Sequence, residues 1–173
     1  MQTAWLDAMD ERGETPLTRA MKSGHAPVTD LLMTQGRPFA SGAGVEMHPL
    51  HWAACHGMKA MTLQYMRWGV SPDTADLEGE TALHKAARHG DLTIAEVLVE
   101  HGAHINAMDN YGLTPLHWVA LNGSVELAEF LLDSGADVNV RERFAGGLTP
   151  FALAKVMKYK QLTRVLGRYG GSW

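Results

Sequence analysis

A motif of twelve residues recurs along the chain at a fixed spacing of 33 residues. It reads G-E-T-A-L-H-K-A-A-R-H-G from Gly79 to Gly90 and G-L-T-P-L-H-W-V-A-L-N-G from Gly112 to Gly123. An earlier version, H-P-L-H-W-A-A-C-H-G, ends at Gly57. A fixed period of this length is typical of tandem structural repeats, in which each unit packs only on its neighbours.

Each unit predicts two short helices. Thr81 stands where a hydroxyl caps a helix N-terminus, and Pro115 occupies the first helical position of the next unit, where its missing N–H costs nothing. Gly90 fits the left-handed conformation that ends a helix. A second apolar segment follows at 92–100. Helices this short are unstable alone, so the pairs must stack on one another.

The pattern G-x-T-P-L-H-x-A-A-x-x-G, followed by L-L-x-x-G-A-x-x-N, resembles the ankyrin repeat. The resemblance covers nearly the whole chain and implies an all-α fold, an ankyrin-repeat α-solenoid of stacked helix pairs with β-turn fingers. We expect a single ankyrin-repeat domain over 1–173. It would consist of a partial finger at 1–9 and repeats at about 10–42, 43–75, 76–108, 109–141 and 142–173.

Several positions depart from the pattern, among them Thr18 in the first copy, which stands where the second, third and fourth copies have histidine. In the second copy His48 takes the place of the capping threonine. The spacing from Thr114 to Thr149 is 35 residues, which predicts two extra residues in the finger at 141–147. In the fifth copy Lys158 stands where glycine ends the first helix of the other copies.

Composition indicates an intracellular protein. No apolar run approaches the ~20 residues that span a bilayer, so no membrane insertion is expected. The N-terminus lacks the basic and apolar segments of a secretory signal, and the single Cys55 excludes an intramolecular disulfide. We therefore expect a cytoplasmic monomer, with a nuclear location left open.

Charge is distributed unevenly along the chain. Residues 141–173 hold seven basic side chains and one acidic one, a local charge of +6, whereas residues 1–140 carry −10. The basic end has three interpretations: a solvated end of the stack, a contact for an acidic protein surface, or a nucleic-acid contact. Because the acidic part would repel phosphates, no nucleic acid is expected as a partner.

Neither a metal site nor a catalytic site is expected. The resemblance implies that His51, His84 and His117 each form a bond back to the capping threonine. No H-E-x-x-H or paired-cysteine motif occurs, so no metal and no cofactor are predicted. Cys55 and His56 are adjacent on a helix, where neighbours point about 100° apart, a poor geometry for an activated thiolate. The chain is therefore not predicted to be an enzyme.

The resemblance implies that a partner protein binds the concave side, formed by finger tips and first helices. The candidate partner-binding residues are Trp52, His56, Leu77, Glu78, Glu80, Arg88, His89, Asn110, Tyr111, Leu113, Trp118, Leu121 and Asn122. Tyr111 is the preferred anchor, because a finger tip gives little structural reason for an aromatic ring. Glu78 and Glu80 would favour a partner with a basic rim.

Trp52 and Trp118 have two interpretations. They are either partly buried between first helices or partner anchors. The other copies hold Arg19, Lys85 and Leu153 at the same place. A position that accepts lysine and arginine is not expected to be fully buried.

These features predict a non-catalytic protein–protein interaction module. Two alternatives remain: an inhibitory or regulatory subunit of an enzyme, and a fragment of a larger multidomain ankyrin scaffold, which the start within a repeat suggests. Asn106 and Asn139 each follow a leucine by eight residues, Leu98 and Leu131. This spacing resembles ankyrin sites of asparaginyl hydroxylation by an iron- and oxoglutarate-dependent enzyme.

Overall fold

The computed structural model describes residues 10, 16–23, 25, 28–29, 31–32, 48–143 and 146–173. The chain divides into two compact units, Met1–Pro49 and Leu50–Trp173, and each is described by itself. The partial finger expected at 1–9 lies outside the described residues. In the ranges given above, helices are the regular elements and no strand occurs. None of the described helices is both long and apolar enough to cross a membrane.

The first unit contains helix α1 (Pro16–Lys22). Arg19 on this helix pairs with Asp10, with 3.4 Å between Nη1 and Oδ2. Ala20 is buried, and so is Thr29, whose hydroxyl donates to the carbonyl of His25 at 3.0 Å.

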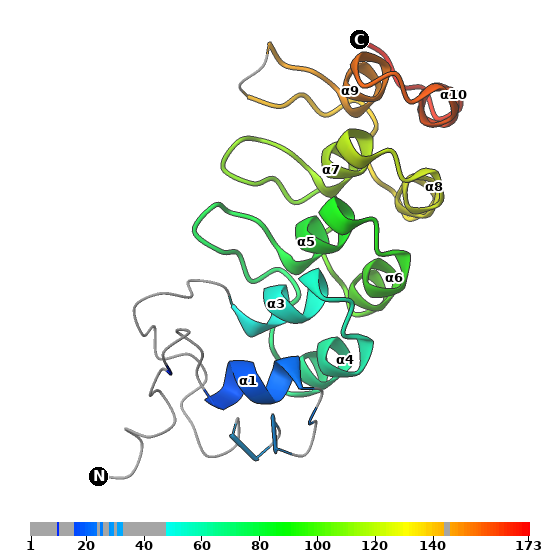
Figure 1. Cartoon of the computed structure of the whole chain (residues 1–173). Helices are drawn as coiled ribbons and strands as arrows, with labels where there is room; N and C mark the ends of the chain where they lie inside the picture. Colours follow the sequence, from blue (N-terminus) through cyan, green and yellow to red (C-terminus); the bar gives the residue numbers. More distant parts are fainter. Residues whose placement is uncertain are drawn as a thin grey trace. The chain divides into compact units, whose positions relative to one another are not determined.

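The second unit is a stack of helix pairs, which confirms the predicted fold class (Figure 1). α5, α7 and α9 pack in one row, and α4, α6, α8 and α10 pack in a second row behind it. The fingers project on the side of the first row (Figure 1). The helices are α3 (Pro49–Cys55), α4 (Lys59–Arg67), α5 (Ala82–His89), α6 (Leu92–Glu100), α7 (Pro115–Asn122), α8 (Val125–Asp133), α9 (Pro150–Val156) and α10 (Lys160–Arg168).

The core lies between the two rows and between successive pairs. Its large apolar members are Tyr65, Ile94 and a series of leucines, all nearly inaccessible to solvent. Small residues allow neighbouring helices to approach closely. Ala87 and Ala95 in one pair, and Ala120 and Ala128 in the next, are each 0% exposed. No single pair of seven- to nine-residue helices buries enough surface to be stable, so each layer depends on its neighbours.

The helix ends follow the sequence pattern. The Thr81 N–H donates to Nδ1 of His84 at 3.0 Å, and the Thr81 hydroxyl lies 2.9 Å from the same nitrogen. Thr114 and His117 repeat the arrangement, which confirms the expected bond back to the capping threonine in both copies. Gly90 ends α5 with φ of 71°.

The capping histidines also connect successive copies. Since Nδ1 of His84 accepts a hydrogen bond, its Nε2 carries the proton and donates to the carbonyl of Leu113 at 3.1 Å. His117 reaches Leu148 and His51 reaches Thr74 in the same way. Burial lowers the pKa of all three rings, so they are neutral links between layers.

The finger after α8 differs from the others at the predicted two-residue extension. Glu142 stands there in place of aspartate, and its Oε1 accepts the N–H groups of Gly147 and Leu148, both at 3.0 Å. Because glutamate is one methylene longer than aspartate, its carboxylate reaches these N–H groups across the extended turn. Lys158 has φ of +64°, so lysine adopts the left-handed conformation in the place where other copies have glycine.

Candidate binding surface

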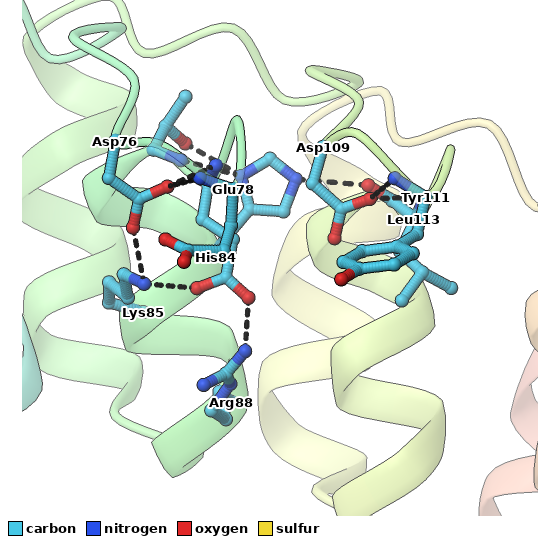
Figure 2. Close-up of polar contacts among 10 residues, drawn as sticks. Asp76, Glu78, His84, Lys85, Arg88, Asp109, Tyr111 and Leu113 are labelled. Atoms are coloured by element: carbon cyan, nitrogen blue, oxygen red, sulfur yellow. Dashed lines mark hydrogen bonds and ion pairs between the residues drawn. The ribbon is translucent and has the colours of Figure 1, made fainter.

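An aspartate closes the finger turn in both the third copy (76–108) and the fourth copy (109–141). Oδ1 of Asp109 accepts the N–H groups of Tyr111 at 2.8 Å and Leu113 at 2.9 Å. Oδ1 of Asp76 accepts those of Glu78 and Glu80 at 3.1 and 2.8 Å. Figure 2 shows the two turns side by side. These bonds fix each tip before any partner is present.

A charge network fills the space beneath the turn of the third copy (Figure 2). Nζ of Lys85 lies 2.6 Å from Oδ2 of Asp76 and also pairs with Glu80. The second carboxylate oxygen of Glu80 pairs with Arg88. Two acidic and two basic side chains therefore neutralise one another in a single chain of contacts.

Burial of this network corrects two expectations. Glu80 is 3% exposed and bonded to two cations, so it is not an accessible acid at the finger tip. The adjacent Lys85 is 5% exposed, so a position that accepts lysine can be fully buried after all. Two carboxylates in contact with the ammonium group compensate for its loss of water.

The network shifts the pKa values of its members. Burial alone would raise the pKa of Asp76, but the Lys85 ammonium and the Glu80 N–H outweigh it and hold that pKa below its ordinary value. Burial would lower the pKa of Lys85, but its contacts with Asp76 and Glu80 raise it instead. Both groups are therefore charged near neutral pH.

Trp118 continues the network into the fourth copy. The guanidinium carbon of Arg88 lies 4.0 Å from the centre of the Trp118 ring, a cation–π contact. Trp118 occupies the place that Lys85 holds in the third copy. Its Nε1 and Oδ2 of Asp109 are buried, and neither atom has a hydrogen-bond partner among the described residues. The fourth copy thus has the aspartate but no cation beside it.

Trp52 is placed differently from Trp118. It is 8% exposed and stacks on the ring of His56, with 3.9 Å between the ring centres. Nδ1 of His56 also donates to the Trp52 carbonyl at 2.8 Å. Of the two interpretations of Trp52, burial agrees with this exposure and an exposed anchor does not. His56, which stacks on the Trp52 ring, is exposed.

The finger tips form a connected row. The Asn110 N–H donates to the carbonyl of Glu78 at 2.9 Å, and its side-chain amide donates to the carbonyl of Leu77 at 2.8 Å. One copy further on, the Arg143 N–H donates to the carbonyl of Tyr111 at 2.9 Å. The side chains of Leu77 and Tyr111 are 66% and 49% exposed.

The candidate binding residues on the first helices differ in how far their side chains are exposed to solvent. Arg88 and His89 are exposed at the end of α5, and Leu121 is half-buried on α7. Asn122 is exposed, but its amide donates to the carbonyls of Ala87 and Arg88 and so covers the end of α5. That role is structural, because it satisfies carbonyls that the helix leaves unpaired.

Asn106 and Asn139 bond to the following copy. Oδ1 of Asn106 accepts the Asp137 N–H at 2.8 Å, and its amide donates to Gly135. Asn139 bonds in the same way to Ser172 and Gly170. Their hydroxylation remains a prediction, which peptide mass would test.

The sequence alone did not identify Asp76, Lys85 and Asp109 as the buried side chains that support this surface. The sequence did contain a sign of the ion-pair network. One acidic and two basic residues at positions 80, 85 and 88 of the third copy are all replaced in the fourth, by Leu113, Trp118 and Leu121. In the described part of the chain, no three His, Cys, Asp or Glu side chains are grouped as a metal site.

Comparison with known proteins agrees with the repeat geometry. The family model for ankyrin repeats (3 copies) matches residues 50–142, more than half of the chain. A search of curated proteins found no match. With its threonine–histidine caps, stacked helix pairs and aspartate-closed fingers, the chain belongs to the ankyrin repeat family, whose members are generally protein–protein interaction modules.

Proposed function

We propose that this chain is a non-catalytic module that binds a partner protein through the finger tips and first helices of its third and fourth copies. The observation that carries the proposal is the pair of exposed apolar side chains, Leu77 and Tyr111, on adjacent tips that hydrogen bonds hold in place. Aromatic residues in such positions are common binding anchors.

The surface requires little ordering on binding. Asp76 and Asp109 close the turns, and Asn110 joins one tip to the next. Because the backbone is already fixed, a partner would lose mainly its own freedom and that of a few side chains.

The partner would present apolar or aromatic groups instead of a strongly basic rim. Glu80 is neutralised by Lys85 and Arg88, so Glu78 is the acid that remains exposed at these tips. The apolar members Leu77, Tyr111 and Trp118 then supply most of the available contact energy.

A non-catalytic role agrees with the state of Cys55. Burial raises the pKa of its thiol, which keeps the sulfur protonated near neutral pH. A nucleophilic cysteine has the opposite shift.

The test is affinity capture from the native source with three proteins side by side. These are the wild type, a Tyr111→Ala/Trp118→Ala variant, and a Trp68→Ala/Tyr169→Ala control that removes the same two residue types from the ends of second helices, where they are 38% and 41% exposed. Circular dichroism first establishes that all three are folded, and Tyr111→Ala alone serves if the Trp118 change unfolds the stack.

Partners that the control retains and the tip variant loses would support the proposal. Identical partner sets for all three proteins would contradict it. A partner lost only by the control would move the site to the second helices.

A further inference from the structure

A basic groove of about 400 Å³ lies at the end of the stack, between α9 and α10. It is lined by Lys155, Lys158, Lys160, Thr163 and Arg164. The volume is within the range of small binding pockets. Residues 143–173 contain no aspartate or glutamate, so these cations have no acid nearby in sequence.

The groove occupies the place where one copy packs on the next elsewhere in the stack. Lys155 aligns with Ala87 and Ala120, which are 0% exposed, whereas Lys155 is exposed. Thr163 aligns with the equally buried alanines of α6 and α8. A charged and a polar side chain therefore line this face in positions that hold buried alanines in the other copies.

The positive charge at position 164 is specific to this copy. Arg164 aligns with Glu96 and Glu129, so the sign of the side chain reverses at the same position. Arg168, by contrast, is paired with Glu129 at 3.0 Å. Across the described residues, the four cations that line the groove make no ion pair.

The backbone also holds one cation in a costly conformation. Lys158 has φ of +64°, where the equivalent residues are glycines with φ of 64° to 83°. A side chain in the left-handed region is strained, and such strain is concentrated at functional sites. Lys155 is positioned too, since its Nζ lies 4.6 Å from the centre of the Trp173 ring.

We propose that this groove binds an acidic segment of a protein, whose carboxylates provide the ion-pair partners that the described residues do not supply. Val156 ends α9 and Met157 follows it. Their side chains, 56% and 43% exposed, lie between Lys155 and Lys158 in the sequence and offer apolar contact to the same segment. A nucleic acid fits less well, because a long polyanion would also meet the repulsion of residues 1–140, which carry −10.

The test uses the full chain and a short fluorescein-labelled peptide of alternating glutamate and glycine. Its glutamine counterpart and an oligothymidine of equal charge are the comparison probes. The binding variant is Lys158→Gln/Arg164→Gln. The control is Lys59→Gln/Arg67→Gln, which removes the same charge from exposed positions on α4.

The wild type is expected to bind the glutamate peptide and not the glutamine one. The binding variant should lose affinity about tenfold or more, and the control should stay within about twofold. Amide shifts in NMR spectra should appear at residues 155–164. A Tyr111→Ala/Trp118→Ala protein should bind the peptide normally, so this result is independent of the proposed function.

Several outcomes would overturn the proposal. They are an equal loss in both variants, a tighter complex with oligothymidine than with the acidic peptide, and amide shifts outside α9 and α10. Failure of the wild type to bind the glutamate peptide at all would do the same.

Discussion

The third and fourth copies share one backbone design and differ in what lies beneath the finger. In the third copy Lys85 joins Asp76 to Glu80, and Arg88 completes a neutral network. In the fourth copy leucine, tryptophan and leucine occupy the positions of Glu80, Lys85 and Arg88. The turn is unchanged, so the fold does not require the network.

The third copy pairs its own charges internally, whereas the fourth copy has apolar side chains that a partner can contact. A buried ion-pair network and a well-packed apolar cluster are often similar in stability. What changes is the chemistry available to a partner. The paired charges of the third copy have little attraction left for a partner. In the fourth copy the Tyr111 side chain is half exposed and Trp118 is only partly buried.

The largest expected effect comes from Lys85→Met. The change leaves Asp76 and Glu80 buried without their shared cation, which should lower the free energy of unfolding by about 3 kcal/mol or more. Urea denaturation followed by circular dichroism measures it. Trp118→Leu, at the equivalent place, should cost clearly less.

A matched variant tests the same comparison in reverse. Glu80→Leu/Lys85→Trp/Arg88→Leu gives the third copy the residues of the fourth. It should recover most of the stability that Lys85→Met loses. Lys85→Met behaving like the wild type would show that the buried contacts contribute nothing.

The two turn aspartates should respond unequally to neutralisation. Asp76→Asn loses a charged contact with Lys85, which should cost about 2 kcal/mol, whereas Asp109→Asn removes no ion pair and should cost less than about 1 kcal/mol. Urea midpoints of the two variants measure the difference. Equal losses would contradict the assigned difference between the copies.

The stability that the Asp76–Lys85 ion pair contributes should also depend on pH. Because the pKa of Asp76 is depressed in the folded state, its contribution is present above the unfolded pKa of about 3.9 and is lost as pH falls through the folded value. Asp76→Asn should therefore lie closest to the wild type in stability at the lowest pH. A difference that grows with acidification would be inconsistent with this sign.

A second pH effect concerns the buried histidines. Burial lowers the pKa of His84 and His117 in the folded state, so their contribution is present above the unfolded pKa of about 6.5 and declines as pH falls below it. Thermal midpoints from about pH 7.5 to about pH 5.5 should decrease. His117→Gln should make that decrease shallower; an unchanged slope would exclude His117 from the effect.

The smallest effect is expected at Lys158. Lys158→Gly removes the strain of the left-handed conformation and should raise stability by about 0.5–1 kcal/mol. Gly123→Ala, at the equivalent place, should do the opposite, since an added Cβ would lie 2.9 Å from Cε1 of Tyr159. A loss of stability in Lys158→Gly would show that lysine is favoured there for another reason.

The repeat pattern predicted most of the fold, and part of the surface. Thr81, Thr114 and Gly90 act locally, so their roles follow from spacing alone. The burial of Glu80 could not be predicted from the repeat pattern. Alignment of the copies indicates which side of the repeat a residue faces, but it does not show whether a cation is buried beside it. The tip-to-tip bonds of Asn110 depend on the distance between copies, which sequence does not encode locally.

The most direct test of the central claim is photo-crosslinking with a benzophenone amino acid in place of Tyr111, beside the same substitution at Tyr169 on the second-helix row. With the captured partner, the chain should form a covalent adduct from position 111 and none from position 169. Adducts from position 169 alone would place the partner away from the finger tips and contradict the account.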